Sequence, residues 1–111
     1  KLTNLTVVID YNGLSSEDYI ADTANLAPLA DKVSAFGFDT LVVDGHNISE
    51  ILTAIKVSKE KQGIVAGNPS AIILKTKKAK GLVTIEGKPK SHHTLPKGED
   101  IELCRRSLAN D

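Results

Sequence analysis

Three apolar runs along the chain predict buried strands. They cover residues 5–10, 39–44 and 71–76, and Val, Ile and Leu make up at least half of each. Short continuous apolar runs are typical of strands in a parallel sheet, because helices cover both faces of such a sheet. We therefore expect three strands within one sheet.

The segment between the first two runs predicts a helix with one buried face, preceded by a polar loop over residues 11–23. Asn25 is the expected helix cap, Pro28 is tolerated in the first turn, and the helix ends before Gly37. The apolar positions that recur at helical spacing are Leu26, Leu29, Ala30, Val33 and Phe36.

The segment between the second and third runs predicts a second amphipathic helix. Asn47 and Glu50 have the spacing of a capping arrangement at its start, and the helix is expected to end by Gly63. Strands that alternate with helices are typical of right-handed βαβ units. The expected fold class is therefore α/β, with a parallel sheet and flanking helices. The apolar stripe of this second helix consists of Ile48, Ile51, Leu52 and Ile55.

The last part of the chain has a different composition. Residues 77–97 are rich in Lys, Gly, Pro and His and predict an irregular segment, and a short closing helix follows with Ile101, Cys104 and Leu108 on its apolar side. A length of 111 residues allows one domain with one core, so we expect residues 1–111 to form a single partial α/β domain. The absence of Met and the strand that follows Lys1 almost directly favour a fragment or one piece of a split protein.

Composition excludes several classes of partner. Lys and Arg number 14, as do Asp and Glu, so the net charge gives no reason to expect nucleic acid or a membrane surface as a partner. Aromatic residues make up 4% of the chain, which leaves little surface for stacking on bases. The single Cys104 excludes an internal disulfide, and a cytoplasmic location is the expectation.

The residues that follow the first predicted strand are candidates for binding a metal and a phosphate. In open α/β sheets, ligands bind outside the carboxyl ends of the strands, and Mg²⁺ takes amide and carbonyl oxygens together with phosphate oxygens. Asn12 can supply a side-chain oxygen and Leu14 a backbone carbonyl. An ordinary turn is the alternative, because Asn-Gly is a common turn pair. The residues alone leave both interpretations open.

Six motifs follow one another along the chain. They are residues 1–14 (KLTNLTVVIDYNGL), 25–32 (NLAPLADK), 35–38 (AFGF), 43–46 (VDGH), 72–76 (IILKT), and His92-His93 followed by Leu95-Pro96. In this order they resemble the thiamine-diphosphate-binding domain of transketolases, and the resemblance spans nearly the whole chain. It is greatest to the amino-terminal subunit of the split bacterial and archaeal forms. It implies that the chain is the carboxyl-terminal part of this domain, and so part of a thiamine-diphosphate-binding fold.

The resemblance implies two cofactors, thiamine diphosphate and Mg²⁺, and three site residues. Asn12 matches the Asn that coordinates Mg²⁺ through its side-chain oxygen, and Leu14 matches the residue whose backbone carbonyl is another metal ligand. His92 matches the His near the mouth of the active site, close to cofactor and donor substrate. The resemblance thus makes His92 the catalytic residue, and all three residues cofactor-binding.

The chain also departs from the family's pattern. The Gly-Asp-Gly that forms the first half of the metal motif lies upstream of Asn12 in the family and is not in this sequence. Ser91 stands where the family often has Trp, and Lys78-Ala79-Lys80-Gly81 stands where Lys-Gly-Lys-Gly is frequent. The resemblance therefore implies partner chains, one with the amino-terminal half that carries Gly-Asp-Gly and one that binds the aminopyrimidine.

The expected function is a part of a transketolase-like transferase, active only with its partner chains. Such an enzyme moves a two-carbon ketol unit between sugar phosphates, as in pentose phosphate metabolism. One alternative is another thiamine-diphosphate enzyme, such as a deoxyxylulose-phosphate synthase. A non-catalytic assembly subunit of the same fold is the other.

Other polar residues have ordinary structural interpretations. We expect His46 to organise the loop before the second helix, His93 to be solvated, and Cys104 to lie in the core. The lysines at 75, 77, 78, 80, 88 and 90 could attract a sugar phosphate, but a solvated loop is the more common role of such a run.

Overall fold

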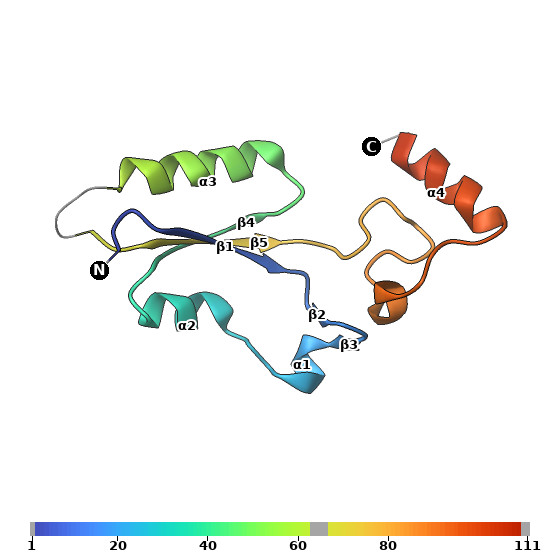
Figure 1. Ribbon diagram of the computed structural model, residues 1–111, viewed down its shortest axis with the longest axis horizontal. Coiled ribbons are helices and arrows are strands. Elements are labelled where there is room, and N and C mark those ends of the chain that lie inside the picture. Colours follow the sequence, from blue (N-terminus) through green and yellow to red (C-terminus); the bar gives the residue numbers. More distant parts are fainter. Residues whose placement is uncertain (1, 63–66, 110–111) are drawn as a thin grey trace. The chain divides into compact units, whose positions relative to one another are not determined.

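The structure, a computed structural model, describes residues 2–62 and 67–109 (Figure 1). These residues divide into two compact units. The first consists of Lys1–Tyr11 and Leu26–Thr76, and the second of Asn12–Asn25 and Lys77–Asp111. The expectation of one domain over residues 1–111 stays a prediction.

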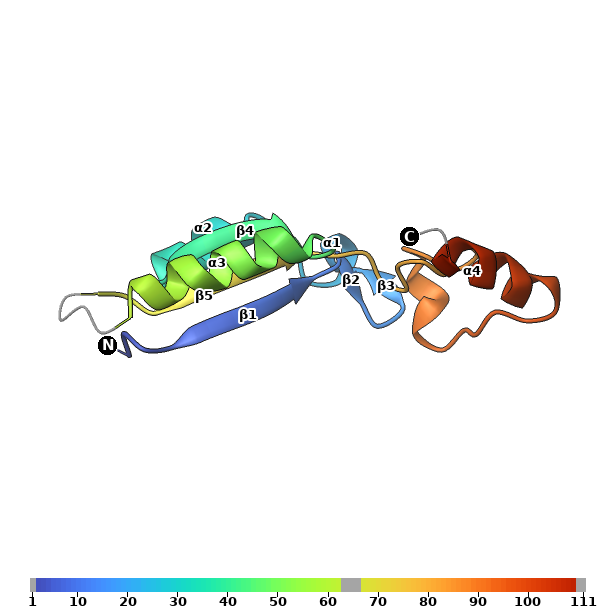
Figure 2. The ribbon, with the colours of Figure 1, turned by 90° about the horizontal axis from the view of Figure 1, so that it is seen from above.

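The first unit is built around a parallel sheet of three strands. β1 (Thr6–Tyr11), β5 (Ser70–Lys75) and β4 (Asp39–Asp44) pair in the order β1-β5-β4, and both pairings are parallel. Thr6 and Asp39 pair with the same residue, Ser70, so the strands begin level with one another. Their carboxyl ends therefore lie at one edge of the sheet, as the parallel arrows in Figure 2 show. The predicted α/β fold class is confirmed.

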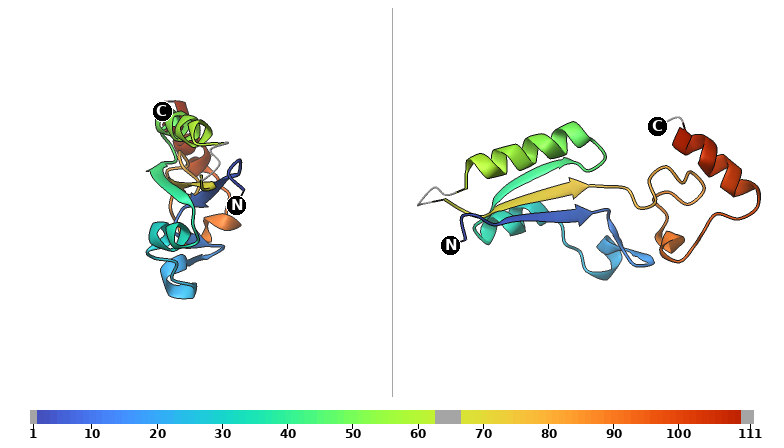
Figure 3. Two further views of the ribbon diagram at one scale, coloured as in Figure 1. Left: turned by 90° about the vertical axis from the view of Figure 1, so that its left-hand side faces the viewer. Right: turned by 45° about the horizontal axis from the view of Figure 1, so that its top comes forward.

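The core of this unit lies along β5. This strand lies between β1 and β4 (Figure 3), and its residues from Ser70 to Ile73 are buried. β1, predicted to be a buried strand, lies at the edge of the sheet, and Val8 is 55% exposed. The prediction was wrong for β1 because burial depends on the order of strands in the sheet, and an apolar run does not encode that order.

Two helices cover opposite faces of the sheet (Figure 1): α3 (Ile48–Glu60) and α2 (Leu29–Ala35). The capping arrangement predicted for α3 is confirmed. The Asn47 Oδ1 accepts the N–H groups of Ser49 at 3.1 Å and Glu50 at 3.2 Å. The Glu50 carboxylate in turn accepts from the Asn47 side-chain amide and from the Asp44 N–H, both at 3.0 Å. The carboxyl end of β4 is thereby tied to the start of α3.

The buried face of α3 differs from the predicted stripe. Ala54 and Ser58 are buried. Of the predicted stripe, Ile51 and Ile55 are half-buried, whereas Ile48 is 68% and Leu52 is 61% exposed. The stripe was predicted from large apolar residues, but the small side chains of Ala54 and Ser58 face the core. The predicted end of the helix, Gly63, lies outside the described residues.

α2 begins later than predicted. Its N-cap is Pro28, which has an extended backbone (φ −79°, ψ 109°), and not Asn25. A proline disfavours helical geometry in the residue before it, so Ala27 cannot belong to the first turn. Along the sequence, Asn25 instead falls in the segment between the short helix α1 (Ile20–Thr23) and α2.

The second unit contains more regular structure than the predicted loops. β2 (Leu14–Ser15) and β3 (Asp18–Tyr19) form a hairpin, and a 3₁₀ helix, η1 (Pro89–His92), interrupts the irregular segment. The closing helix is α4 (Glu99–Ala109), with Cys104 buried as predicted. None of the helices in the described part of the chain is both long and apolar enough to span a membrane.

Candidate functional site

A tight turn at Asn12 leads into the β2–β3 hairpin. The Asn12 Oδ1 accepts the N–H of Leu14 at 2.9 Å, and Gly13 between them has φ +74°, which glycine adopts without strain. The Gly13 carbonyl accepts the N–H of Ile20 at 2.9 Å, and Leu14 pairs with Tyr19 across the hairpin. This Asx turn holds the Asn12 amide oxygen in a fixed place, with a second lone pair for another partner.

Lys78 connects this hairpin to η1. Its Nζ donates to the carbonyl of Ser16 at 2.9 Å and lies 3.0 Å from the Nδ1 of His92. The His92 ring is exposed and packs edge-on against His93, with ring centroids 4.5 Å apart. Asn12, Leu14 and His92 all belong to the second unit. Within this unit, the Lys78 ammonium joins the hairpin to His92.

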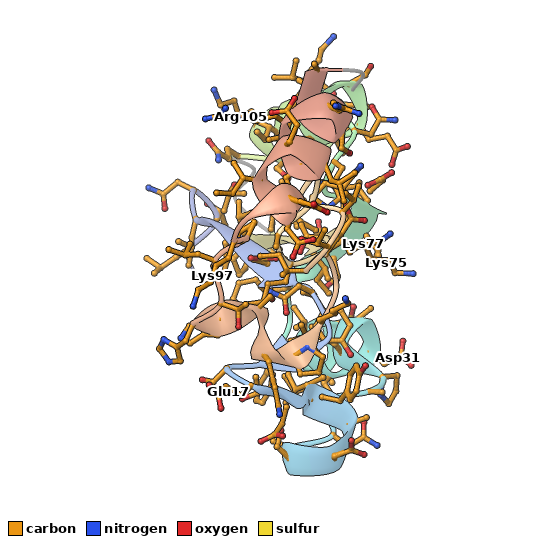
Figure 4. The ribbon with its side chains drawn as sticks, turned by 90° about the vertical axis from the view of Figure 1, so that its right-hand side faces the viewer. Glu17, Asp31, Lys75, Lys77, Lys97 and Arg105 are labelled. Carbon is orange, nitrogen blue, oxygen red and sulfur yellow. The ribbon has the colours of Figure 1, made fainter. Side chains whose placement is uncertain are left out.

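Lys78 was predicted to be a solvated lysine, and its contacts were missed. It is half-buried, and its two partners lie 62 and 14 residues away along the sequence. The only available signal was its place in the motif that resembles Lys-Gly-Lys-Gly. Figure 4 shows the side chains of this unit, with Glu17 on the hairpin and Lys77 at the start of the loop that carries Lys78.

Hydrogen bonds close the loop that carries Lys78. The Lys78 carbonyl accepts the N–H of Gly87 at 2.8 Å. The Glu86 carboxylate accepts the N–H of Gly81 at 2.8 Å and pairs with the Lys77 ammonium at 3.0 Å. These partners, the Gly81 N–H first and Lys77 next, lower the pKa of Glu86 below its ordinary value. The backbone at Lys78 thus lies where the two ends of this closed loop meet.

A second group of polar residues lies at the carboxyl edge of the sheet, in the first unit. The Asp10 carboxylate accepts the hydroxyl of Thr76, which joins the ends of β1 and β5. The Asp44 Oδ1 accepts the backbone N–H of His46 at 2.8 Å, so His46 forms part of the turn after β4.

Gly45 brings that turn against the end of β5. Its N–H donates to the Lys75 carbonyl at 2.8 Å. A Cβ at this position would lie 2.4 Å from the Thr76 Cγ2 and 2.9 Å from the Leu74 Cβ. The close approach therefore requires glycine here, a constraint that the Val-Asp-Gly-His motif alone does not reveal.

Few metal ligands are gathered in the part of the chain that the structure describes. Over residues 2–62 and 67–109, no group of three or more His, Cys, Asp or Glu side chains is placed to hold a metal ion. The Asn12 amide oxygen fits a hard cation, because it is a neutral oxygen donor already fixed by the Leu14 N–H. The Asn12 turn thus fits one portion of a Mg²⁺ site, since Mg²⁺ requires about six oxygen ligands.

Comparison with known proteins identifies relatives along nearly the whole chain, although no family model matches it. The chain is 40% identical over 93 residues to the 6-deoxy-6-sulfo-D-fructose transketolase subunit SqwG of Clostridium sp. (strain MSTE9), covering 84% of this chain. It is 31% identical over 111 residues, 100% of its length, to an apulose-4-phosphate transketolase subunit of Actinobacillus succinogenes. The chain belongs to the transketolase family.

A solved transketolase structure has the same fold as the chain. The transketolase of Campylobacter jejuni superposes with a TM-score of 0.81 and 30% sequence identity over 98% of this chain. The chain spans only part of these transketolases: 32% of SqwG, 38% of the apulose-4-phosphate transketolase polypeptide and 16% of the C. jejuni chain.

Proposed function

We propose that the chain is part of a transketolase-type enzyme that uses thiamine diphosphate and Mg²⁺. The enzyme transfers a two-carbon ketol unit from a ketose phosphate to an aldose phosphate. The observation that carries this proposal is the 40% identity to a transketolase subunit over 84% of the chain. The Asn12 turn and the contact between Lys78 and His92 support it, because they bring candidate ligands and a titratable group into one unit.

The relatives' names also support a substrate class. SqwG is named for 6-deoxy-6-sulfo-D-fructose and the Actinobacillus protein for apulose-4-phosphate, so both names describe a sugar with a sulfo or phosphate group. We assign the present chain to the same class, sugars that carry an anionic group, with a phosphate as the anion. The lysines of residues 77–90 favour such substrates, because cationic groups raise the local concentration of anions.

Two residues would hold the cofactor's anchor. The Asn12 side-chain oxygen and the Leu14 carbonyl would ligate Mg²⁺, which neutralises the charge of the diphosphate. The Leu14 N–H fixes the Asn12 amide, so its oxygen needs little reorganisation to bind the ion. When bound, thiamine diphosphate supplies the carbanion chemistry, and the protein supplies binding and orientation.

His92 is the residue proposed to act on the substrate. Its imidazole is exposed, so a bound sugar can reach it. It would hydrogen-bond to the reacting oxygens or exchange protons with them, a role for which imidazole is suited near neutral pH. Partner chains complete the site in this proposal, and the relatives that are named as subunits support that part of it.

An assay of the assembled protein tests the proposal. The chain is purified with the polypeptides that copurify with it, and two-carbon transfer from a ketose phosphate to an aldose phosphate is measured with both cofactors. We expect activity that chelation abolishes and that added Mg²⁺ restores. An assembly that binds both cofactors without any turnover would contradict the proposal and favour a non-catalytic role in assembly, whereas deoxyxylulose phosphate as product would favour the synthase.

A further inference from the structure

The Nζ of Lys78 stands between a backbone carbonyl and an imidazole nitrogen of the second unit. The distances, 2.9 Å to the Ser16 oxygen and 3.0 Å to the His92 Nδ1, are those of direct hydrogen bonds. Ser16 belongs to the turn of the hairpin, and His92 ends η1. One ammonium group therefore joins two elements of this unit that are remote in sequence.

The chemistry of the two groups determines where the imidazole proton lies. A lysine ammonium has three N–H donors and cannot accept. The Nδ1 of His92 must then be the acceptor, and a neutral imidazole that accepts at Nδ1 carries its proton on Nε2. The contact therefore selects one of the two tautomers and leaves the Nε2–H as a donor.

The loop around Lys78 keeps its ammonium in this place. Gly87 donates to the Lys78 carbonyl, and the next residue, Ala79, has a left-handed backbone with φ +57°. Glu86 closes the loop through Gly81 and Lys77. Lys78 thus extends from a backbone that is fixed on both sides, so placing its ammonium costs side-chain freedom but little further backbone freedom.

We propose that Lys78 is a positioning residue for His92, which it holds in the Nε2-protonated tautomer and against the hairpin. His92 then presents a hydrogen-bond donor, and not an acceptor, to the reacting oxygen of the substrate. The tautomer follows from the contact itself, whereas its catalytic consequence rests on the function proposed above.

Nitrogen-15 NMR of the imidazole rings in the full chain tests the tautomer without any activity. At a pH at which the rings are neutral, we expect His92 to be Nε2-protonated, with His93 as the internal reference. Lys78→Met, which keeps the length of the side chain and removes the donor, should give His92 a mixture of tautomers. It should also shift the amide signals of Ser16 and Glu17. Lys78→Arg, which restores a cationic donor, should restore the wild-type spectrum.

Lys90→Met is the matched control, because Lys90 lies in the same 3₁₀ helix two residues before His92 and its substitution removes the same charge. It should leave the His92 tautomer unchanged. Unchanged amide signals from α4, which belongs to the same unit as Lys78 and His92, report that this unit is folded in each variant. The proposal is overturned if wild-type His92 shows the same tautomer mixture as His93, or if Lys78→Met and Lys90→Met affect His92 equally.

Kinetics of the assembled enzyme test the catalytic consequence. Lys78→Met should lower kcat by roughly 10- to 100-fold, the range for groups that orient a functional imidazole, with a smaller change in KM, and Lys78→Arg should recover most of the loss. An unchanged kcat in Lys78→Met would overturn the catalytic part. A wild-type assembly without ketol transfer would instead contradict the proposed function, while the NMR experiment decides the tautomer independently.

Discussion

At the scale of single residues, the Asn12 side chain has one role in the structure and a second role that we propose. Its oxygen already accepts the Leu14 N–H, and the same oxygen is the proposed Mg²⁺ ligand. These roles are compatible because an amide oxygen has two lone pairs. The turn therefore orients the ligand before any metal binds, which lowers the cost of binding.

Replacing Asn12 with Ala should weaken binding of Mg²⁺ and thiamine diphosphate to the assembled enzyme by at least roughly 10- to 100-fold. Removal of a residue that only orients a metal ligand already costs that much, and Asn12 is proposed to be a ligand itself. The fold should survive, because a single hydrogen bond contributes only about 1 kcal/mol. Cofactor titration of the variant assembly measures the effect. Asn4→Ala, at an exposed Asn before β1, is the control, and unchanged affinity in Asn12→Ala would remove Asn12 from the site.

Adjacent imidazoles allow a matched test of the proposed catalytic residue. His92 contacts Lys78, whereas His93 packs its ring edge-on against His92. His92→Ala should lower turnover by about 10²- to 10⁴-fold, the usual range for a positioned proton-transfer group, with a smaller change in cofactor affinity. His93→Ala should have little effect. If both substitutions lower turnover equally and only slightly in a steady-state assay, both residues are solvated side chains without a catalytic role.

The sequence predicted the turn at Asn12 but not the contacts of Lys78. An Asn-Gly pair after a strand is a local signal, and the turn it predicts is present. The contacts of Lys78 join positions far apart in the sequence, and a loop lysine is solvated in most proteins. No local pattern could have identified them, and whether Asn12, Leu14 and His92 bind cofactor stays a prediction.

At the scale of elements, the local patterns predicted the bounds of β4 and the start of α3 well. Apolar runs and an Asn cap act within a few residues, so these bounds follow from nearby side chains. Long-range pairing decided the position of β1, because β5 inserts between β1 and β4 and leaves the first run at an edge. The later start of α2 has a local cause, because Pro28 disfavours helical geometry in the residue before it.

The loop from Lys77 to Gly87 should lose stability in acid through Glu86. The folded-state pKa of Glu86 lies below its ordinary value of 4.5, because the Gly81 N–H and the Lys77 ammonium favour the carboxylate. A lowered pKa stabilises the folded state above the unfolded value, and this contribution is lost as the pH falls through the folded pKa. Glu86→Gln should therefore be less stable than wild type near neutral pH, and the difference should shrink as the pH falls below 4.5 and through the folded-state pKa.

Thermal unfolding of wild type and Glu86→Gln across this pH range measures the difference. Glu17→Gln is the control, because Glu17 is an exposed carboxylate of the same unit. A difference between Glu86→Gln and wild type that stays constant from neutral to acid pH would show that the carboxylate charge does not stabilise the loop.

At the scale of the whole molecule, both outer strands of the sheet are edges in the part of the chain that the structure describes. Val8 on β1 is 55% exposed and Val42 on β4 is 44% exposed. Natural sheets cover or blunt such edges, because unpaired strands promote association with other chains. The relatives are longer, since the chain spans 32% of SqwG. Both observations agree with the proposal that partner chains complete the protein.

The chain alone should therefore bind thiamine diphosphate poorly. The proposed ligands within it are one amide oxygen and one carbonyl, and the described residues hold no cluster of His, Cys, Asp or Glu for a metal. Mg²⁺ gives up its water reluctantly, so two neutral oxygens leave it largely hydrated and cannot anchor a diphosphate. Calorimetric titration of the purified, monodisperse chain with Mg²⁺ and the cofactor should show no micromolar binding. Binding should appear with the chains that carry Gly-Asp-Gly and the aminopyrimidine site. Micromolar affinity in the chain alone would mean that it contains a complete site, and would contradict the need for partners.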